Sequence, residues 1–224
     1  MKTLFKAIAV ASLATSGVAQ ALEGSIGAMN EYTFRGETLA TSGIYAASAG
    51  TSVAGLDLGL AVVDADGYFE RNLMVGYGLN IAGVDVDLGY TNYSYGEGSD
   101  DEEDEISVGI NVSGVSITYV DGEDSNTNGG DYDYSVLSFG YSVGGMDITV
   151  GAVERDGDGA VFDAVAGTGN GPGSNAEFNY YEISTGTEVA GLDATVTLTN
   201  TFSEEGIAAQ DARIVVGVSK ALSL

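Results

Sequence analysis

The stretch Ile81-Ala82-Gly83-Val84-Asp85-Val86-Asp87-Leu88-Gly89-Tyr90 decides the fold class of this chain. After Gly83, apolar side chains at every second position alternate with aspartate or glycine, which is the period of a β-strand with one apolar and one polar face. Before Ala82, the same alternation runs backward through Ile81 and Leu79. A two-residue loop places the residues that flank it on one face of two antiparallel strands. The stretch therefore predicts a β-hairpin.

Four more short turns share this pattern of an apolar residue, a small residue, glycine and a second apolar residue. The five instances are Val53-Ala54-Gly55-Leu56, Ile81-Ala82-Gly83-Val84, Val112-Ser113-Gly114-Val115, Val143-Gly144-Gly145-Met146 and Val189-Ala190-Gly191-Leu192. Six longer polar connections alternate with them, near residues 36–43, 65–67, 96–103, 121–131, 156–176 and 203–210. Twelve strands are expected between these connections, at residues 25–35, 44–53, 56–64, 68–81, 84–95, 104–112, 115–122, 132–143, 146–155, 177–189, 192–202 and 211–222.

These strands have the features of a membrane barrel. Strands of about 9–11 residues suit a tilted membrane crossing, and an even strand number with short turns at one end and long loops at the other is typical of outer-membrane barrels. The expected outward face carries little charge, and Arg71 and Lys220, each near a strand end, can place their charges at the membrane interface. We therefore expect an all-β fold, an antiparallel transmembrane β-barrel of about 12 strands with short periplasmic turns and long acidic extracellular loops. A soluble β-sandwich is the alternative.

Aromatic residues on the expected outward face give the barrel an orientation. They are Tyr32, Phe34, Tyr45, Tyr90, Tyr119, Tyr181 and Phe202. All of them fall toward the long-loop ends of their strands. Such a belt of aromatic rings is typical of one membrane–water interface, so we expect a girdle at the extracellular side.

The first 21 residues read as a secretory signal peptide. Lys2 and Lys6 give a positive start, residues 7–13 form a short apolar stretch, and Ala19-Gln20-Ala21 is a small-x-small cleavage site. The domain organisation expected is a cleaved signal peptide at 1–21 and a single barrel domain at 22–224. Secretion through the inner membrane would then deliver the barrel to the outer membrane of a Gram-negative bacterium.

Composition excludes several classes of function. The chain has 33 acidic and 7 basic residues, a formal charge of −26, and neither histidine nor cysteine. Zinc fingers, iron–sulfur clusters, haem sites with His or Cys ligands, cysteine hydrolases and Ser-His-Asp triads are therefore absent. The negative charge repels phosphates, which argues against nucleic acid as a partner. We expect no enzymatic activity and no cofactor.

Alternation predicts two groups of charged side chains on the inner face. Asp57, Asp85, Asp147 and Asp193 each stand two positions after a turn glycine, and Glu188 joins them, so these acids should form a ring near the periplasmic mouth. Carboxylate rings attract cations and repel anions, although strand-end solvation explains these acids equally well. The second group is Glu31, Arg35, Arg155, Glu182 and Arg213. It predicts either a transverse field across a constriction or a structural salt-bridge network that fills a narrow barrel. Together the ten residues are the expected pore lining.

The long connections are acidic. Residues 100–105 are six consecutive acids, a type of run that is usually solvated. Asp124, Asn126 and Asn128 match the first half of an EF-type calcium loop, but the twelfth position is Ser135 rather than glutamate. An ordinary acidic loop is therefore the expectation, with calcium binding as the alternative. The 21-residue segment 156–176 is the longest connection, and long loops are usually functional or disordered.

Two segments carry a resemblance to a known family. Asn30-Glu31-Tyr32-Thr33-Phe34-Arg35-Gly36 resembles the first-strand motif of the TorF family of porins, roughly Ser-Asp-Tyr-Val-Phe-Arg-Gly. The valine-rich ending at residues 215–222, with Ser219-Lys220, is similar to the ending of that family. The residues after Gly36 depart from the family pattern, and the last residue is Leu224 where an aromatic residue is typical. The resemblance implies an outer-membrane channel.

The function expected from the sequence is a porin-like channel for passive diffusion of small hydrophilic solutes that prefers cations. The expected partners are outer-membrane lipid and those solutes, and the residues leave a homo-oligomer open. The first alternative is a non-conducting structural or adhesion barrel with acidic, calcium-binding surface loops. The second is a secreted soluble β-sandwich that binds calcium or polysaccharide.

Overall fold

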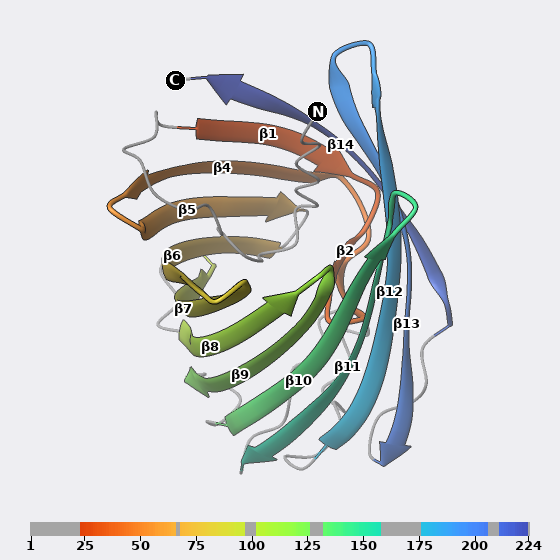
Figure 1. Ribbon diagram of the computed structural model, residues 1–224. Helices are drawn as coiled ribbons and strands as arrows, with labels where there is room; N and C mark the ends of the chain where they lie inside the picture. Colours follow the sequence, from red (N-terminus) through yellow and green to blue (C-terminus); the bar gives the residue numbers. More distant parts are fainter. Residues whose placement is uncertain are drawn as a thin grey trace.

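The protein is a closed antiparallel β-barrel of twelve strands with a two-stranded sheet as a separate element (Figure 1). The computed structural model describes residues 23–65, 68–96, 102–125, 132–157, 176–205 and 211–223. The barrel strands are β1 (Glu23–Met29), β4 (Ile44–Val53), β5 (Leu56–Ala65), β6 (Tyr68–Ile81), β7 (Val84–Tyr95), β8 (Glu102–Val112), β9 (Val115–Ser125), β10 (Tyr132–Val143), β11 (Met146–Gly157), β12 (Ala176–Val189), β13 (Leu192–Glu205) and β14 (Arg213–Ser223). In the described residues, no helix is long and apolar enough to cross a membrane. The predicted fold class is confirmed.

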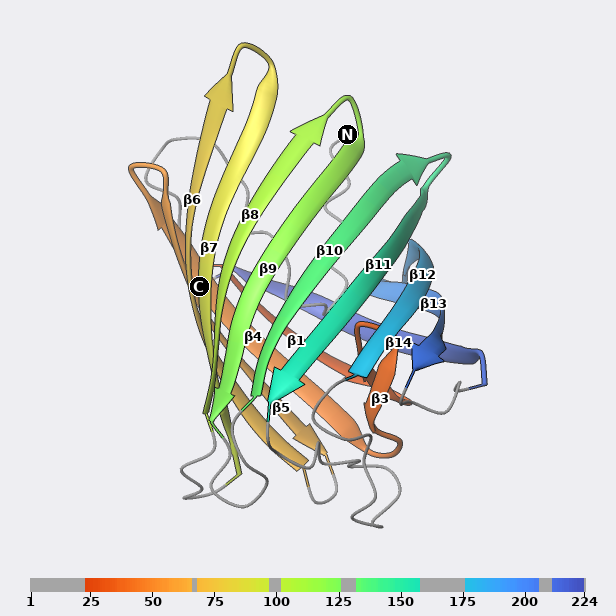
Figure 2. The ribbon, with the colours of Figure 1, turned by 90° about the horizontal axis from the view of Figure 1, so that it is seen from below.

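The barrel closes because β1 pairs with both β14 and β4. Every other barrel strand pairs with its neighbours in the chain, so each backbone ladder has a partner, as a lipid environment requires. Figure 2 shows the short turns β6–β7, β8–β9 and β10–β11 along one edge of the barrel. The β12–β13 hairpin extends beyond the β10–β11 turn, because β12 continues to Val189 past the pair Met146–Thr185 (Figure 1). Residues 1–22, which include the expected signal peptide, lie outside the described residues.

The five short turns have the geometry of type I′ hairpins. Both central residues have positive φ, as for Ala82 at 54° and Gly83 at 88°. This turn matches the right-handed twist of the flanking strands. Ala54, Ser113 and Ala190 take the same left-handed conformation as Ala82, whereas the turn after β10 has Gly144 there. A Cβ in this conformation is strained, so four of the five turns carry a small local cost.

We expect Ala82→Asn to stabilise the folded barrel by about 1 kcal/mol, because asparagine tolerates the left-handed region and Asn-Gly is a preferred type I′ pair. Urea unfolding in detergent, followed by the loss of heat-modifiable gel migration, measures the change. Gly144→Ala is the matched control, since it places a Cβ at φ 60° where nothing lies within 4 Å. It should destabilise the barrel by a similar amount. Equal unfolding midpoints for the two variants would contradict the conclusion that Ala82 is strained in this turn.

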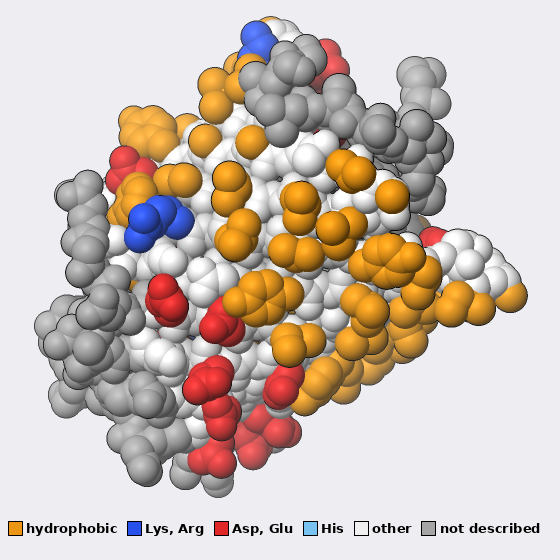
Figure 3. Space-filling view, turned by 90° about the vertical axis from the view of Figure 1, so that its left-hand side faces the viewer, with side chains coloured by type: hydrophobic (Ala, Val, Ile, Leu, Met, Phe, Trp, Pro, Cys, Tyr) orange, Lys and Arg blue, Asp and Glu red, His pale blue; other side chains and the backbone are white. Residues whose placement is uncertain are grey.

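Alternation separates an apolar outer face from a polar inner one. On β5, Leu56, Leu58 and Leu60 are 40–58% exposed, whereas Asp57 and Val63 are 1% and 2% exposed. Figure 3 shows such hydrophobic side chains spread over one outward face. An exposed apolar surface of this extent on a closed barrel is suited to contact with lipid.

Acidic side chains continue the outward face toward the long-connection ends of the strands. In the strand register, Asp104 lies opposite Glu123, Glu123 opposite Asp133, and Asp133 opposite Asp156. This outer acidic row therefore crosses β8 to β11, and Figure 3 shows Asp and Glu side chains gathered on the lower part of that face. The row also corrects one expectation. Glu102 and Glu103, which were expected in the connection 96–103, belong to β8.

We expect Asp133→Asn to raise the stability of the barrel by about 0.5 kcal/mol at low ionic strength, because like charges directly opposite in a sheet repel. Asp133 is exposed and stands between two acids, Glu123 and Asp156. Unfolding midpoints at low and high NaCl measure the effect. Salt should remove most of the gain, and a gain that is the same at both salt concentrations would argue against repulsion as its cause.

The first connection differs most from expectation. The predicted strand 25–35 is wrong beyond Met29, where β1 ends. Asn30 then bonds to β14 three times: its N–H donates to the Val216 carbonyl at 3.1 Å, its Nδ2 to the Ile214 carbonyl at 3.2 Å, and its Oδ1 accepts from the Val216 N–H at 2.6 Å. Because this side chain takes up ladder positions of β14, the chain leaves the wall here. It forms the hairpin β2 (Tyr32–Phe34) and β3 (Glu37–Ala40).

Candidate functional site

The β2–β3 hairpin lies inside the barrel. Its residues contact side chains of β6, β8, β11, β12, β13 and β14, which surround it on several sides. Glu31, Tyr32 and Thr38 are 8%, 3% and 4% exposed. The expectation that Tyr32 and Phe34 face outward in an aromatic girdle is therefore wrong. Tyr32 is buried, and Phe34 packs edge-on against the inward Tyr93 at 6.0 Å between ring centroids.

The hairpin turn presses against the wall. Gly36 has φ of +80°, and a Cβ there would lie 2.7 Å from Cβ of Tyr180 and 2.8 Å from Cγ2 of Thr201. Only glycine fits this approach and this conformation together. The Gly36 N–H also donates to the Glu182 carboxylate of β12. This part of the TorF-like motif thus fixes the hairpin against β12 and β13.

Three ion pairs hold the hairpin to three other strands. Arg35 pairs with Glu105 of β8. Glu37 pairs with Arg155 of β11, whose Nη1 lies 3.2 Å from Oε1 and whose Nη2 bonds the second oxygen. Arg213 of β14 places Nη1 2.6 Å from Oε1 of Glu31. Largely buried pairs of this kind are costly to break by removing one partner, by about 3–5 kcal/mol.

Hydrogen bonds from hydroxyl groups and a cation–π contact complete the attachment. The Tyr32 hydroxyl donates to Glu70 of β6 at 3.0 Å, and the Thr38 hydroxyl donates to Glu31 at 3.0 Å. Burial and the neighbouring Glu70 carboxylate raise the pKa of Tyr32 well above its ordinary value, so this phenol remains a neutral donor. The Arg35 guanidinium lies 4.3 Å from the Phe34 ring centroid, within cation–π range.

Tyrosines and glutamates of the wall surround the hairpin. Tyr134 is 5% exposed and donates to both Glu103 and Glu105 of β8. Tyr93 also donates to Glu105, at 3.0 Å. The described carboxylates that make the contacts above are Glu31, Glu37, Glu70, Glu103, Glu105 and Glu182, and the described bases that make them are Arg35, Arg155 and Arg213. The hairpin level, meaning these nine residues, carries more acid than base.

Sequence reasoning missed four members of the hairpin level. Glu70 lies on the inner face by alternation, which could have identified it. Glu103 and Glu105 also alternate with outward acids, but the unbroken acid run concealed their period. Glu37 could not be found, because the sequence does not reveal that its segment folds inward.

The inner acids near the short turns form two groups rather than one level ring. Asp57 is 1% exposed and accepts from the Ser52 hydroxyl, while Asp85 is exposed and accepts from Nδ2 of Asn80 at 2.5 Å. Asp87, absent from the expected ring, interacts electrostatically with both of these carboxylates. Asp147 accepts from the Ser142 hydroxyl at 2.5 Å, four strands farther along the sheet from Asp85.

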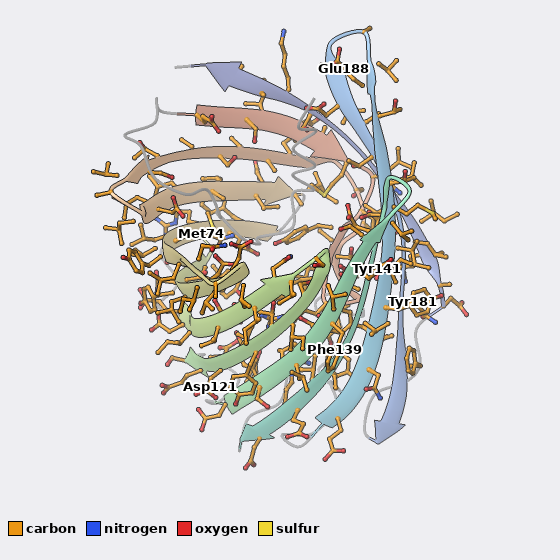
Figure 4. The ribbon with its side chains drawn as sticks, viewed as in Figure 1. Met74, Asp121, Phe139, Tyr141, Tyr181 and Glu188 are labelled. Carbon is orange, nitrogen blue, oxygen red and sulfur yellow. The ribbon has the colours of Figure 1, made fainter. Side chains whose placement is uncertain are left out.

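Glu188 and Asp193 form the second group. They lie opposite each other on the β12–β13 hairpin, and Figure 4 shows Glu188 near its turn, away from the body of the barrel. Both are exposed. Both carboxylates therefore lie beside the β12–β13 turn.

The calcium alternative gains no support from the described residues. Asp124 lies in β9, opposite Glu103 and Tyr132, whereas Asn126 and Asn128 lie outside the described residues. Across the described ranges, no group of three acids is placed to hold a metal ion. Most of the long segment 156–176 also lies outside them, from 158 to 175.

Comparison with known proteins identifies the architecture. No protein-family model and no curated protein matches the sequence. A structure from a study of in-meso crystallization of membrane proteins aligns with a TM-score of 0.57 at 10% identity, over 91% of this chain and 83% of that one. The outer membrane protein OprD from Pseudomonas aeruginosa aligns with a TM-score of 0.50 at 12% identity, over 92% of this chain and 66% of OprD.

These similarities concern the fold. The chain has the porin-like barrel architecture and spans about two thirds of the length of OprD. The closed barrel and its outward apolar face agree with this architecture, and together they place the protein in the outer membrane of a Gram-negative bacterium.

Proposed function

We propose that the protein is an outer-membrane channel for passive diffusion of small hydrophilic solutes, narrowed by the β2–β3 hairpin. The observation that carries the proposal is the polar, ion-paired attachment of this hairpin inside a closed barrel. Apolar side chains could fill the lumen of a barrel at a lower desolvation cost than charged side chains. Charged groups along a lumen are instead suited to contact with water and polar solutes.

Cation preference is part of the proposal. Acids outnumber bases six to three at the hairpin level. Toward the short turns, Asp85, Asp87 and Asp147 lie on the inner face. Among the described residues, alternation places one base on the inner face of β5 to β11, which is Arg155 at the long-connection end of β11. Both levels therefore present a negative potential to a passing ion, which favours cations.

We also propose that the chain is a channel of the TorF type. The TorF-like segment, residues 30–36, supplies the residue that leaves the wall (Asn30), the glycine that fits against β12 and the arginine that pairs with β8. In a TorF-type channel, this motif would therefore encode the constriction instead of a stretch of barrel strand. The proposed activity is transport and not catalysis.

A non-conducting barrel is the second candidate. The attachment of the hairpin on several sides and the buried rings of Tyr93, Tyr134, Phe178 and Tyr180 favour it, because they occupy much of the lumen at one level. Its working surface would be the acidic rim of the strands and the connections beyond it.

Liposome swelling separates the two candidates. Folded protein, identified by heat-modifiable gel migration, is reconstituted into liposomes that are diluted into isotonic solutions of sugars of increasing size. A channel narrowed by the hairpin should admit small sugars and exclude larger ones. Liposomes with heat-unfolded protein are the control. Swelling no faster than this control for every sugar would overturn the channel and support the non-conducting barrel.

A further inference from the structure

A groove of about 490 Å³ crosses the outer surface of the barrel over β14, β1, β4 and β5. Its lining includes two rows of outward side chains in the strand register. One row is Lys220–Ile26–Ala47–Val62, and the other is Val218–Ala28–Tyr45–Asp64. Leu192 of β13 closes one end beside Lys220. This lipid groove, as we name it, belongs to the membrane-facing surface and not to the lumen.

Small side chains make the groove. Ala28 and Ala47 lie beside the larger Tyr45 and Ile26 in these rows, and Ile26 and Tyr45 are 51% and 63% exposed. Elsewhere the outward face carries large residues on neighbouring strands, such as Ile106, Val108 and Ile117 on β8 and β9. The surface is therefore lowered over β1 and β4 compared with β8 and β9.

The charges at its ends give the groove a direction. Lys220 is the one base in the lining, and within the described ranges it pairs with no carboxylate. It lies three residues from Ser223, the last described residue of β14, which is about 10 Å along the strand toward the periplasmic side. Asp64 lines the opposite end. Arg71 of β6 lies opposite Val62 near Asp64, so charges of both signs offset each other at that end. An anionic headgroup is therefore attracted more strongly at the Lys220 end, where the lining holds a base and no acid.

We propose that the lipid groove binds one anionic phospholipid of the periplasmic leaflet. The Lys220 ammonium binds the headgroup phosphate, since a lysine stem can follow an apolar surface and place its charge at the interface. One acyl chain lies over Ala28 and Ala47, toward Tyr45. Each methylene that leaves water or looser lipid contact adds to the affinity of the chain, and the headgroup fixes its orientation.

Native mass spectrometry of the detergent-solubilised protein with added phosphatidylglycerol tests the site. Wild type should retain one lipid. Lys220→Gln should need about fivefold more lipid for equal occupancy, the effect of one interfacial charge. Ala47→Leu fills the groove and keeps the charge, and it should weaken binding as well. Arg71→Gln is the matched control for the position of the charge, because Arg71 is also outward and exposed but lies opposite Val62, at the other end of the groove from Lys220.

Three results would overturn the proposal: equal lipid retention in Lys220→Gln and Arg71→Gln, unchanged retention in Ala47→Leu, or a dimer peak that replaces the lipid adduct. The last result would assign the groove to a second copy of the chain. Glycerol phosphate, which has the headgroup charge without a chain, should not be retained at the same concentration, and its retention would also contradict the role of the chain. None of these outcomes depends on whether the lumen conducts.

Discussion

Replacing residues 30–43 with a two-residue Asn-Gly turn is expected to raise single-channel conductance several-fold. This segment contains the whole β2–β3 hairpin. Met29 and Ile44 already face each other across β1 and β4, so a tight turn can join them without moving either strand. Removal of the hairpin leaves the twelve-strand ladder intact and takes the constriction out of the lumen. Planar-bilayer recordings of the folded variant and of wild type measure the change.

A pair of single substitutions controls for nonspecific effects of the replacement. Arg35→Gln removes the ion pair with Glu105 inside the barrel, whereas Arg71→Gln removes the same charge from the outer face. The first should increase conductance or its fluctuations, because the hairpin turn loses one of its attachments. The second should leave the recordings unchanged. Wild-type conductance in the hairpin-less variant would show that β2–β3 does not limit the passage.

The second large effect is expected on ion selectivity. Substituting Asn for Asp85, Asp87 and Asp147 removes three inner carboxylates toward the short turns, and reversal potentials under a salt gradient should shift toward zero. Fixed charges act over about 8 Å at physiological salt, so the shift should be largest at low salt. Asp57 is left in place because it is 1% exposed and accepts a hydrogen bond from Ser52.

The chain itself provides a control with equal charge. Asp121, Asp133 and Glu154 are exposed on the outer face of β9, β10 and β11, and Figure 4 shows Asp121 pointing away from the barrel. Neutralising these three changes the net charge by the same amount without touching the lumen. If both triple variants shift the reversal potential equally, selectivity arises from overall charge and not from the inner acids.

The wall of the barrel could be predicted because it follows from period and turns alone. Apart from the first strand, each strand lies within three residues of its expected bounds. The repeated turns made this possible, since each one fixes the register of two strands and hence which face is apolar. Turn type could not be predicted, because alanine before glycine is not a typical type I′ pair. The pairing of the flanking strands offsets the strain of alanine at positive φ.

The inward hairpin could not be predicted. Tyr32 and Phe34 continue the alternation that precedes them, so period alone cannot distinguish a strand in the wall from one inside it. The difference depends on Asn30, whose side chain bonds to Val216 of β14, 186 residues later, and on ion pairs with residues 118 and 182 positions away in the sequence. Such contacts exist only once the barrel has closed.

The residues of the candidate site could be predicted only in part, for the same reason. Alternation placed Arg155 and Arg213 on the inner face, but it could not supply Glu37 as the partner of Arg155. It also grouped the turn-proximal acids into one ring, whereas the stagger of the strands places Glu188 and Asp193 on a projecting hairpin. Sequence gives the face of each residue in a barrel, and the shear of the strands decides its height.

Single-channel recording of the folded wild-type protein in a planar bilayer tests the central claim most directly. The account predicts discrete conductance steps in wild type that are smaller than those of the variant without residues 30–43. Under a salt gradient, the sign of the reversal potential should show that cations pass more readily than anions. Steps in the hairpin-less variant together with none in wild type would contradict it, because β2–β3 would then close the barrel instead of narrowing it.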